Sequence, residues 1–265
     1  MKKILFSIAV IASALSLMSC ITVSWNGSGK ALKGSGNVVV HNLGELKFSA
    51  VKASRMIKVT IVDSLQKDVI VRADDNLLEY INLKVEGGEL IASFDHSHGV
   101  SGDVTLDVIV PNNGRIRSLE ASGASKIECE SVLRAGEMEL DASGASMIEV
   151  TVEARELSVE ATGASKCVVS AYVDETEVDV SGASKAVLTG RALRADLEAS
   201  GASKIKASEL LTDYCTADAG GASKIVLHCD KELVVRVGGA SKISYYGDCQ
   251  IKSSQIGGAS EVERE

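Results

Sequence analysis

Residues 121–127 read Ala-Ser-Gly-Ala-Ser-Lys-Ile, and residues 219–225 repeat them almost unchanged as Ala-Gly-Gly-Ala-Ser-Lys-Ile. The Gly-Ala-Ser triplet occurs eight times, with its glycine at Gly123, Gly144, Gly163, Gly182, Gly201, Gly221, Gly239 and Gly258. The steps between copies are 21, 19, 19, 19, 20, 18 and 19 residues. So even a spacing marks a repeat architecture in which each copy is one structural unit.

The residues before each glycine alternate between apolar and charged side chains. In the first copy, Leu119 and Ala121 flank Glu120, and the later copies keep this order. A second alternating segment starts after the triplet, with Ile127 as its first apolar residue. Period-two alternation is typical of strands with one buried face. A repeat of about 19 residues then predicts an all-β fold, a right-handed parallel β-helix (β-solenoid) with one repeat per turn.

The repeated glycine and serine lie between the two strands of each turn. A corner there needs an unusual backbone conformation or a close approach of two chains, and glycine allows both. We expect the serine hydroxyls to form a ladder that satisfies backbone groups at this corner. Residues 116–265 form the repeat region. Residues 35–115 lack the triplet but contain strand-like runs, and are expected to cap the solenoid or to form its irregular first turns.

The first residues resemble an export signal. Met1-Lys2-Lys3 is basic, and residues 4–17 are apolar but too short to span a bilayer comfortably. The segment ends in Leu17-Met18-Ser19-Cys20, which resembles the lipobox of bacterial lipoproteins. We therefore expect a signal peptide at 1–19, a lipid on Cys20, and a tether up to residue 34; an ordinary signal peptide with an incidental cysteine is the alternative. Attached acyl chains would anchor the protein to a membrane without spanning it.

Several landmarks together resemble one known family. They are the lipobox, the repeated Ser-Gly-Ala-Ser-Lys, and three further stretches: Gly34-Ser35-Gly36-Asn37, Ala73-Asp74-Asp75-Asn76-Leu77-Leu78 and Val85-Glu86-Gly87-Gly88-Glu89-Leu90-Ile91. The chain is similar to the putative auto-transporter adhesin head GIN domain family over roughly residues 35–260. The resemblance implies a right-handed β-helix and a Bacteroidetes envelope lipoprotein, at the outer membrane and facing either the periplasm or the cell surface. It implies no catalytic or ligand-binding residues.

The charge balance argues against nucleic acid as a partner. The whole chain has a formal net charge of −8. Removal of residues 1–19 takes away two lysines and no acids, which leaves 26 basic and 36 acidic residues and a net charge of −10. A strongly acidic chain is repelled by the phosphate backbone.

Two charged columns are the candidate binding surface. Three residues after each glycine stand Lys126, Lys166, Lys185, Lys204, Lys224 and Lys242, with Met147 as an interruption and Glu261 at the end. Three residues before it stand Glu120, Asp141, Glu160, Asp179, Glu198 and Asp218. One interpretation is that the columns neutralise each other across the corner and are only solvated. The other is that they recognise an anionic glycan or cell-wall polymer.

The sequence offers no convincing catalytic or metal site. The carboxylates recur evenly, whereas a glycosidase or lyase needs a local cluster at one turn. His96 and His98 have no third ligand nearby, and the cysteines lack zinc-site spacing. We predict no cofactor. Cys229 and Cys249 lie about one repeat apart, so a disulfide between them is one alternative and free thiols are the other.

These observations predict a lipid-anchored binding or adhesin-like module of the cell envelope, without catalysis. A membrane, reached through Cys20, is the expected partner, and a glycan, a cell-wall polymer or a protein are the ligand classes left open. A carbohydrate-active β-helix enzyme and a self-assembling envelope scaffold are the two alternatives. The oligomeric state is not predicted.

Overall fold

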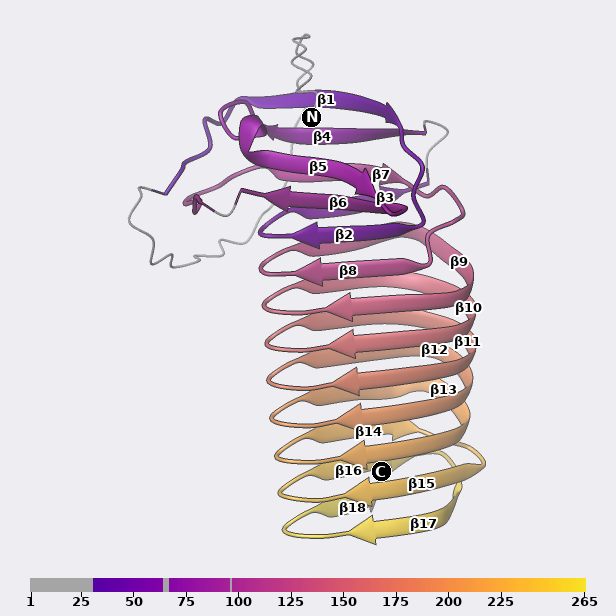
Figure 1. Cartoon of the computed structure of the whole chain (residues 1–265). Helices are drawn as coiled ribbons and strands as arrows, with labels where there is room; N and C mark the ends of the chain where they lie inside the picture. Colours follow the sequence, from indigo (N-terminus) through magenta and orange to yellow (C-terminus); the bar gives the residue numbers. More distant parts are fainter. Residues whose placement is uncertain (1–30, 64–66, 96) are drawn as a thin grey trace.

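The computed structural model describes residues 31–63, 67–95 and 97–265. Over these residues the chain is nearly all β-structure, and its 18 strands belong to one continuous hydrogen-bonded system (Figure 1). One short 3-10 helix, η1 (Leu78–Tyr80), interrupts the strands. The fold is the predicted right-handed parallel β-solenoid with about 19 residues per turn. Within the described segments, no helix is long and apolar enough to span a membrane.

Five long strands form the regular part of the solenoid. Each strand bends midway and so covers two sides of a turn. The sequence pattern would also have fitted short strands separated by corners. They pair parallel with their neighbours, and the register shifts by two residues in the β9–β10 pair and by one residue in the β12–β13 pair. They are β9 (Lys126–Ala142), β10 (Met147–Ala161), β11 (Lys166–Val180), β12 (Lys185–Ala199) and β13 (Lys204–Ala219).

The last turns are built from shorter strands in the same two layers. The layer that follows the glycine corner continues with β14, β16 and β18, and the layer that precedes the corner continues with β15 and β17. Their bounds are β14 (Lys224–His228), β15 (Glu232–Val237), β16 (Lys242–Tyr246), β17 (Gln250–Ile256) and β18 (Glu261–Arg264).

The first turns do not stack in chain order. Strands β2 and β3 form one turn, which lies between the turn of β6 and β7 above it and that of β8 and β9 below it. The chain therefore passes the β2–β3 turn before it enters the regular repeat (Figure 1). The bounds are β2 (Ala50–Ser54), β3 (Lys58–Val62), β6 (Glu89–Phe94), β7 (Leu106–Pro111) and β8 (Ser118–Ser122).

Antiparallel strands close the N-terminal end of the solenoid. These are β1 (Val38–Glu45), β4 (Asp68–Asp74) and β5 (Ile81–Glu86), in the order β1–β4–β7 in one layer and β5–β6 in the other. The buried Asp74 carboxylate accepts hydrogen bonds from the backbone N–H of Gly36 and of Thr105, at 2.7 and 2.8 Å. Both expectations for residues 35–115 are thus confirmed, since some strands cap the solenoid and others form irregular turns.

The repeated glycine is required at each corner for two reasons. Gly182 has φ +73°, a left-handed conformation that side chains disfavour. A Cβ at Gly182 would also lie 2.7 Å from the carbonyl oxygen of Gly163 in the turn above. The same overlap recurs from Gly144 to Gly258, so both predicted reasons for glycine are confirmed.

The repeated serines form the predicted hydroxyl ladder inside the corner. Their side chains are buried except for that of Ser260 in the last turn, and each of several donates a hydrogen bond to a carbonyl of the turn above. Examples are Ser146 to Ala121, Ser165 to Ala142, Ser203 to Val180 and Ser223 to Ala199, all between 2.8 and 2.9 Å. These bonds satisfy polar groups that the tight turn buries.

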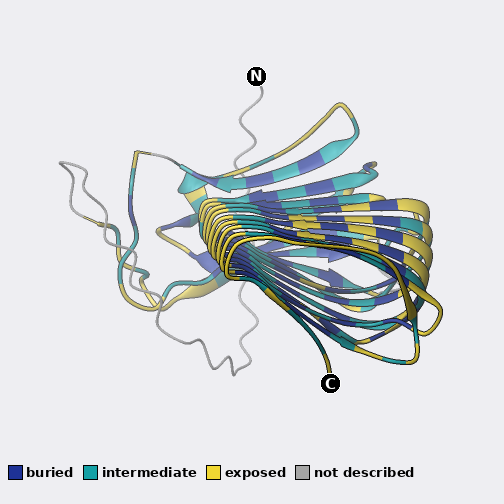
Figure 2. Ribbon diagram, turned by 90° about the horizontal axis from the view of Figure 1, so that it is seen from below, coloured by how far each residue is buried: buried dark blue, intermediate teal, exposed yellow. Residues whose placement is uncertain are grey.

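The core is a stack of identical small layers. Inward-facing side chains are mostly Ala, Val, Leu and Ile, and those of the regular turns are almost fully buried (Figure 2). The two layers meet at the narrow glycine corner, which leaves room for few large side chains. This geometry explains how a chain with only 3% aromatic residues fills its interior.

Candidate binding surface

The two charged columns lie on opposite faces of the solenoid. Each strand layer has one outer face, and the glycine corner folds the layer that carries the acids back against the layer that carries the lysines (Figure 1). Among the described residues, no ion pair joins a predicted lysine to a predicted acid of the other column. The columns therefore do not pair directly across the corner, and whether they are only solvated or bind a ligand stays a prediction.

The predicted lysines form one file in register along the solenoid axis. Lys166, Lys185, Lys204, Lys224 and Lys242 occupy five successive turns without a break. Met147 separates them from Lys126, as the sequence indicates. Lys58 extends the file beyond Lys126, a member that the sequence pattern alone did not reveal because the β2–β3 turn has no Gly-Ala-Ser triplet.

Each end of the lysine file is closed by a carboxylate. At the N-terminal end Asp107 lies in register beside Lys58, and at the C-terminal end Glu261 lies beside Lys242. Further acids pair with the outer lysines only. Glu128 contacts both Lys58 and Lys126, at 2.5 and 2.6 Å, while Glu263 lies 2.7 Å from the Lys242 ammonium.

The four middle lysines have a different environment. Lys166, Lys185, Lys204 and Lys224 take part in none of the ion pairs among the described residues. Two residues along each strand, where Glu128 stands in an outer turn, the middle turns carry Val168, Val187, Lys206 and Val226. We call the surface formed by these four lysines and their neighbours on the same strands the lysine face.

Burial and neighbouring lysines lower the pKa of two lysines of this face. Burial, together with Lys206 and Lys166, lowers the pKa of Lys185. The pKa of Lys204 is lowered by burial and by Lys206, Lys224 and Lys185. At the outer end, burial acts the same way on Lys126, but the Glu128 and Glu149 carboxylates outweigh it and raise its pKa. Carboxylates thus raise the pKa of the outer Lys126, whereas no carboxylate offsets burial at Lys185 or Lys204.

The acid column is also a continuous file, on the opposite layer. Glu120, Asp141, Glu160, Asp179, Glu198 and Asp218 follow one another in register. Cations close this file at both ends: Lys52 lies 2.5 Å from Glu120, and Arg236 lies 3.8 Å from Asp218. Burial and the carboxylates of Asp179, Asp218, Asp196 and Glu177 raise the pKa of Glu198.

A shallow groove of about 600 Å³ runs along the acidic layer, across the turns from β9 to β15. Its charged lining includes Glu137, Glu139, Glu156, Glu175, Glu177, Asp196, Glu232 and Arg194, and Tyr214 also contributes. Some of these acids are held by arginines, since Arg194 lies 3.1 Å from Glu175 and Arg155 lies 3.0 Å from Glu137. No feature of the sequence had indicated a groove here.

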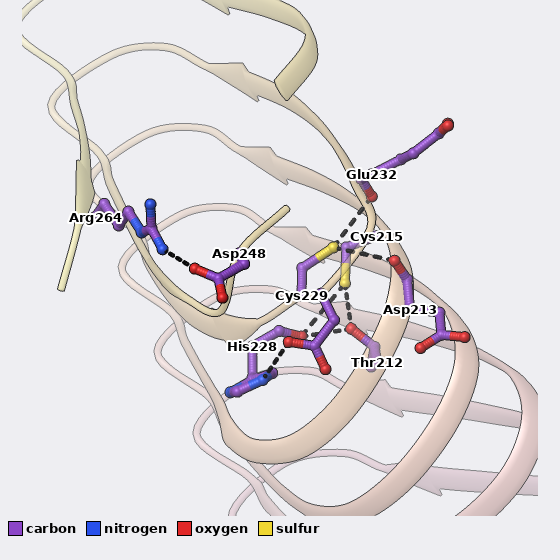
Figure 3. Close-up of polar contacts among 9 residues, drawn as sticks. Thr212, Asp213, Cys215, His228, Cys229, Glu232, Asp248 and Arg264 are labelled. Carbon is purple, nitrogen blue, oxygen red and sulfur yellow. Dashed lines mark hydrogen bonds and ion pairs between the residues drawn. The ribbon is translucent and has the colours of Figure 1, made fainter. Parts of the chain in front are cut away.

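The remaining candidates do not form a metal or disulfide site. Among the described residues no group of three His, Cys, Asp or Glu side chains is arranged to hold a metal ion, and His96 lies outside these residues. Cys229 and Cys249 are free thiols, so the disulfide alternative is wrong for this structure. The Cys229 thiol instead donates to the carbonyls of Glu232 and Asp213, beside buried Cys215 (Figure 3). Cys20 also lies outside the described residues.

The sequence comparison identifies the family. A family model described as "Putative auto-transporter adhesin, head GIN domain" matches residues 47–186 and 163–249. Together these segments span most of the chain. The chain belongs to this family. The predicted resemblance is confirmed, and the head GIN family model includes both the irregular first turns and most of the repeat.

Solved structures share the fold of this head GIN family member. A putative adhesin from Parabacteroides merdae is 20% identical with a TM-score of 0.79. A putative lipid binding protein and a putative adhesin, both from Parabacteroides distasonis, are 18% and 21% identical with TM-scores of 0.79 and 0.78. Each match covers 89% of this chain and 100% of the other chain. No curated protein shows significant similarity to the chain.

Proposed function

We propose that this head GIN protein is a non-catalytic, adhesin-like binding module of the cell envelope, and that its lysine face binds an anionic polymer. The family description and two of the structural relatives carry the word adhesin, which supports the general class. The positive charge of the lysine face supports the choice of an anionic ligand.

The observation that carries this proposal is that the four middle lysines form no ion pair among the described residues. Neighbouring turns place the backbones of successive lysines about 4.8 Å apart, so their like charges lie on adjacent strands. Such neighbours repel by about 1 kcal/mol per pair even in water. Glu128, Glu261 and Glu263 pair with the outer lysines, whereas Lys166, Lys185, Lys204 and Lys224 form no ion pair among the described residues that would offset this repulsion. A polyanion laid along the file would relieve it.

Binding to immobilised anionic polymers tests the proposal. The full chain, purified in detergent, is compared with a variant that carries Lys166→Ser, Lys185→Ser, Lys204→Ser and Lys224→Ser. A control variant changes four lysines elsewhere, Lys33, Lys47, Lys67 and Lys84, and so has the same net charge. We expect binding to be lost in the first variant and retained in the control. Equal loss in both variants would show that only net charge matters and would contradict the proposal.

The lipid anchor is the second part of the proposed function. Leu17-Met18-Ser19-Cys20 has the form of a lipobox, and membrane attachment at Cys20 would place the solenoid in the envelope, at the outer membrane. Mass spectrometry of the N-terminal peptide from membranes should show acyl chains on Cys20. The variant Cys20→Ala should leave the membrane fraction. An unmodified Cys20 on the mature protein would contradict this part of the proposal.

The groove on the acidic layer is the feature that favours the enzymatic alternative, because carbohydrate-active β-helices use carboxylates in clefts. Here similar acids recur on successive turns, and arginines hold Glu137 and Glu175. This repetition supports a surface role. Incubation with polysaccharides is therefore expected to release no reducing or unsaturated ends. Release that stops on substitution of Glu177 would favour the enzyme instead.

Assembly through the solenoid ends is disfavoured by the charges at the C-terminal edge. Glu261 and Glu263 lie on the last strand, β18, and two such edges placed together would bring these carboxylates close to each other. Charged edge residues are a common defence against such pairing. Light scattering over a range of concentrations is expected to show no growth of end-to-end oligomers.

A further inference from the structure

The lysine face carries three parallel columns with different chemistry. In β11, Lys166, Val168 and Ser170 point outward in turn, and in β12 they are matched in register by Lys185, Val187 and Thr189. All six side chains are partly exposed. The columns of ammonium groups, valine methyls and hydroxyls therefore run side by side along the solenoid axis.

The pattern changes gradually in the next turns. In β13 the valine position holds Lys206, and an irregularity in the strand pairing brings Glu209 opposite Thr189. In β14 the three positions hold Lys224, Val226 and His228. The cationic column is thus continuous over four turns, and the apolar column is continuous except at Lys206.

We propose that the occupant of the lysine face is a carboxylated polysaccharide, a chain containing uronic acids, that lies parallel to the solenoid axis. This inference rests on the proposed function, since it specifies the anionic polymer. A uronic acid residue offers a carboxylate for the ammonium column, an apolar C–H ring face for the valine methyls, and hydroxyls for Ser170 and Thr189. A polyphosphate offers anionic oxygens to the ammonium groups and the hydroxyls, but no apolar face for the valine methyls.

The spacing of the turns fits such a chain. Neighbouring parallel strands are about 4.8 Å apart, which is comparable to the advance of a 1,4-linked sugar chain per residue. Successive carboxylates would then meet successive lysines. In a ribbon-like sugar chain, alternate carboxylates point to opposite sides. The carboxylates on the side facing the protein would then contact every second lysine. The four middle lysines span three such steps, or about 14 Å, which corresponds to an oligomer of about four sugars.

Calorimetric titration of the full chain in detergent tests the inference with defined probes. The probes are tetragalacturonate, a neutral galactose oligomer of equal length, and linear polyphosphate. We expect tetragalacturonate to bind, the neutral oligomer not to bind, and polyphosphate to bind at least tenfold more weakly than tetragalacturonate. Affinity should rise with the length of the galacturonate oligomer up to about four sugars and then change little.

A second variant separates sugar recognition from charge alone. Val168→Ser with Val187→Ser removes the apolar column but keeps every lysine, and circular dichroism checks the fold. We expect this variant to lose affinity for tetragalacturonate about tenfold while its affinity for polyphosphate is unchanged. Equal binding of polyphosphate and galacturonate, or no effect of the valine substitutions, would overturn this inference and leave the proposed function standing. Failure of every anionic probe would overturn both.

Discussion

Arg55 occupies, in the turn of β2 and β3, the corner position that Gly123 occupies in the turn below. Residues 53–58, Ala-Ser-Arg-Met-Ile-Lys, therefore form an additional copy of the repeat in which the Gly-Ala-Ser triplet has been replaced. The hydrogen bond of Ser125 to the carbonyl of Ala53, at 2.9 Å, is the same bond that later serines make to the turn above them. The repeat thus begins one turn earlier than its sequence signature.

The replaced corner should be strained at Arg55. This residue has φ 55°, in the left-handed region that costs a residue with a side chain about 1–2 kcal/mol. Its side chain is exposed, so little packing is lost on its removal. We expect Arg55→Gly to increase the free energy of unfolding by about 0.5–1 kcal/mol, after the entropic cost of glycine. Urea titration measures this. Arg55→Ala serves as the control, and an equal gain there would assign the effect to loss of the arginine rather than to strain.

A side chain at a regular corner should be far more disruptive. Gly182→Ala introduces a Cβ 2.7 Å from the carbonyl oxygen of Gly163, at a residue with φ +73°. We expect a loss of at least about 2 kcal/mol in the free energy of unfolding, because conformational strain and backbone overlap add. Gly220→Ala is the matched control, since no heavy atom lies within 4 Å of its added Cβ and its φ is not positive. Similar effects of the two substitutions would contradict the corner geometry.

The serine ladder should contribute measurably at each turn. Ser203 is buried, and its hydroxyl donates to the carbonyl of Val180 at 2.8 Å. Ser203→Ala removes this bond and is expected to cost about 1 kcal/mol. The partly exposed Ser200, in the same corner, provides the comparison. A neutral effect at Ser203 in chemical denaturation would show that the ladder is incidental to stability.

Removal of one negative charge from the acid column should make the protein more stable. Burial and neighbouring acids raise the pKa of Glu198 in the folded state, so the folded protein binds this proton more tightly than the unfolded chain. The cost of the charge is present above the raised pKa and disappears as the pH falls through it. We expect Glu198→Gln to stabilise the protein by about 0.5 kcal/mol at pH 7. The gain should vanish near pH 4.

Thermal unfolding at the two pH values measures this difference. Glu137→Gln is the control, because the Glu137 carboxylate is paired with Arg155 and its removal should bring no gain at pH 7. A gain from Glu198→Gln that is the same at both pH values would mean that charge repulsion within the column is not its cause.

The sequence predicts the regular turns well because several structural requirements of a turn recur together with the Gly-Ala-Ser triplet. The glycine at each corner, the buried serine and the alternating strand residues all recur at the same spacing, so the register of Lys166 with Lys185 follows from the period alone. The order of the first turns does not follow from it. Antiparallel strands β4 and β5 reverse the chain, and the β2–β3 turn then pairs on both sides with segments that come later in the sequence.

The sequence predicts the members of the two charged columns but not their arrangement in space. Spacing from the glycine predicts which residues form each file, but not that the corner turns the two files to opposite faces. Lys52 and Asp107, which close the two files at the N-terminal end, come from the irregular turns and carry no repeat signature, whereas Glu261 at the C-terminal end stands at a repeat position. The groove on the acidic layer depends on the shape of the bend, for which the sequence has no periodic marker.

The proposed binding of an anionic polymer depends on the middle lysines of the file, which form no ion pair among the described residues. Two single substitutions with the same change of net charge test it most directly: Lys185→Ser in the middle, and Lys242→Ser at the end, where Glu261 and Glu263 already pair with the lysine. Affinity for an anionic polymer that the unmodified chain binds is measured by titration at low salt. We expect a loss of about tenfold for Lys185→Ser, the value of one charge-assisted contact, and of less than about twofold for Lys242→Ser. Equal losses for the two variants would contradict it.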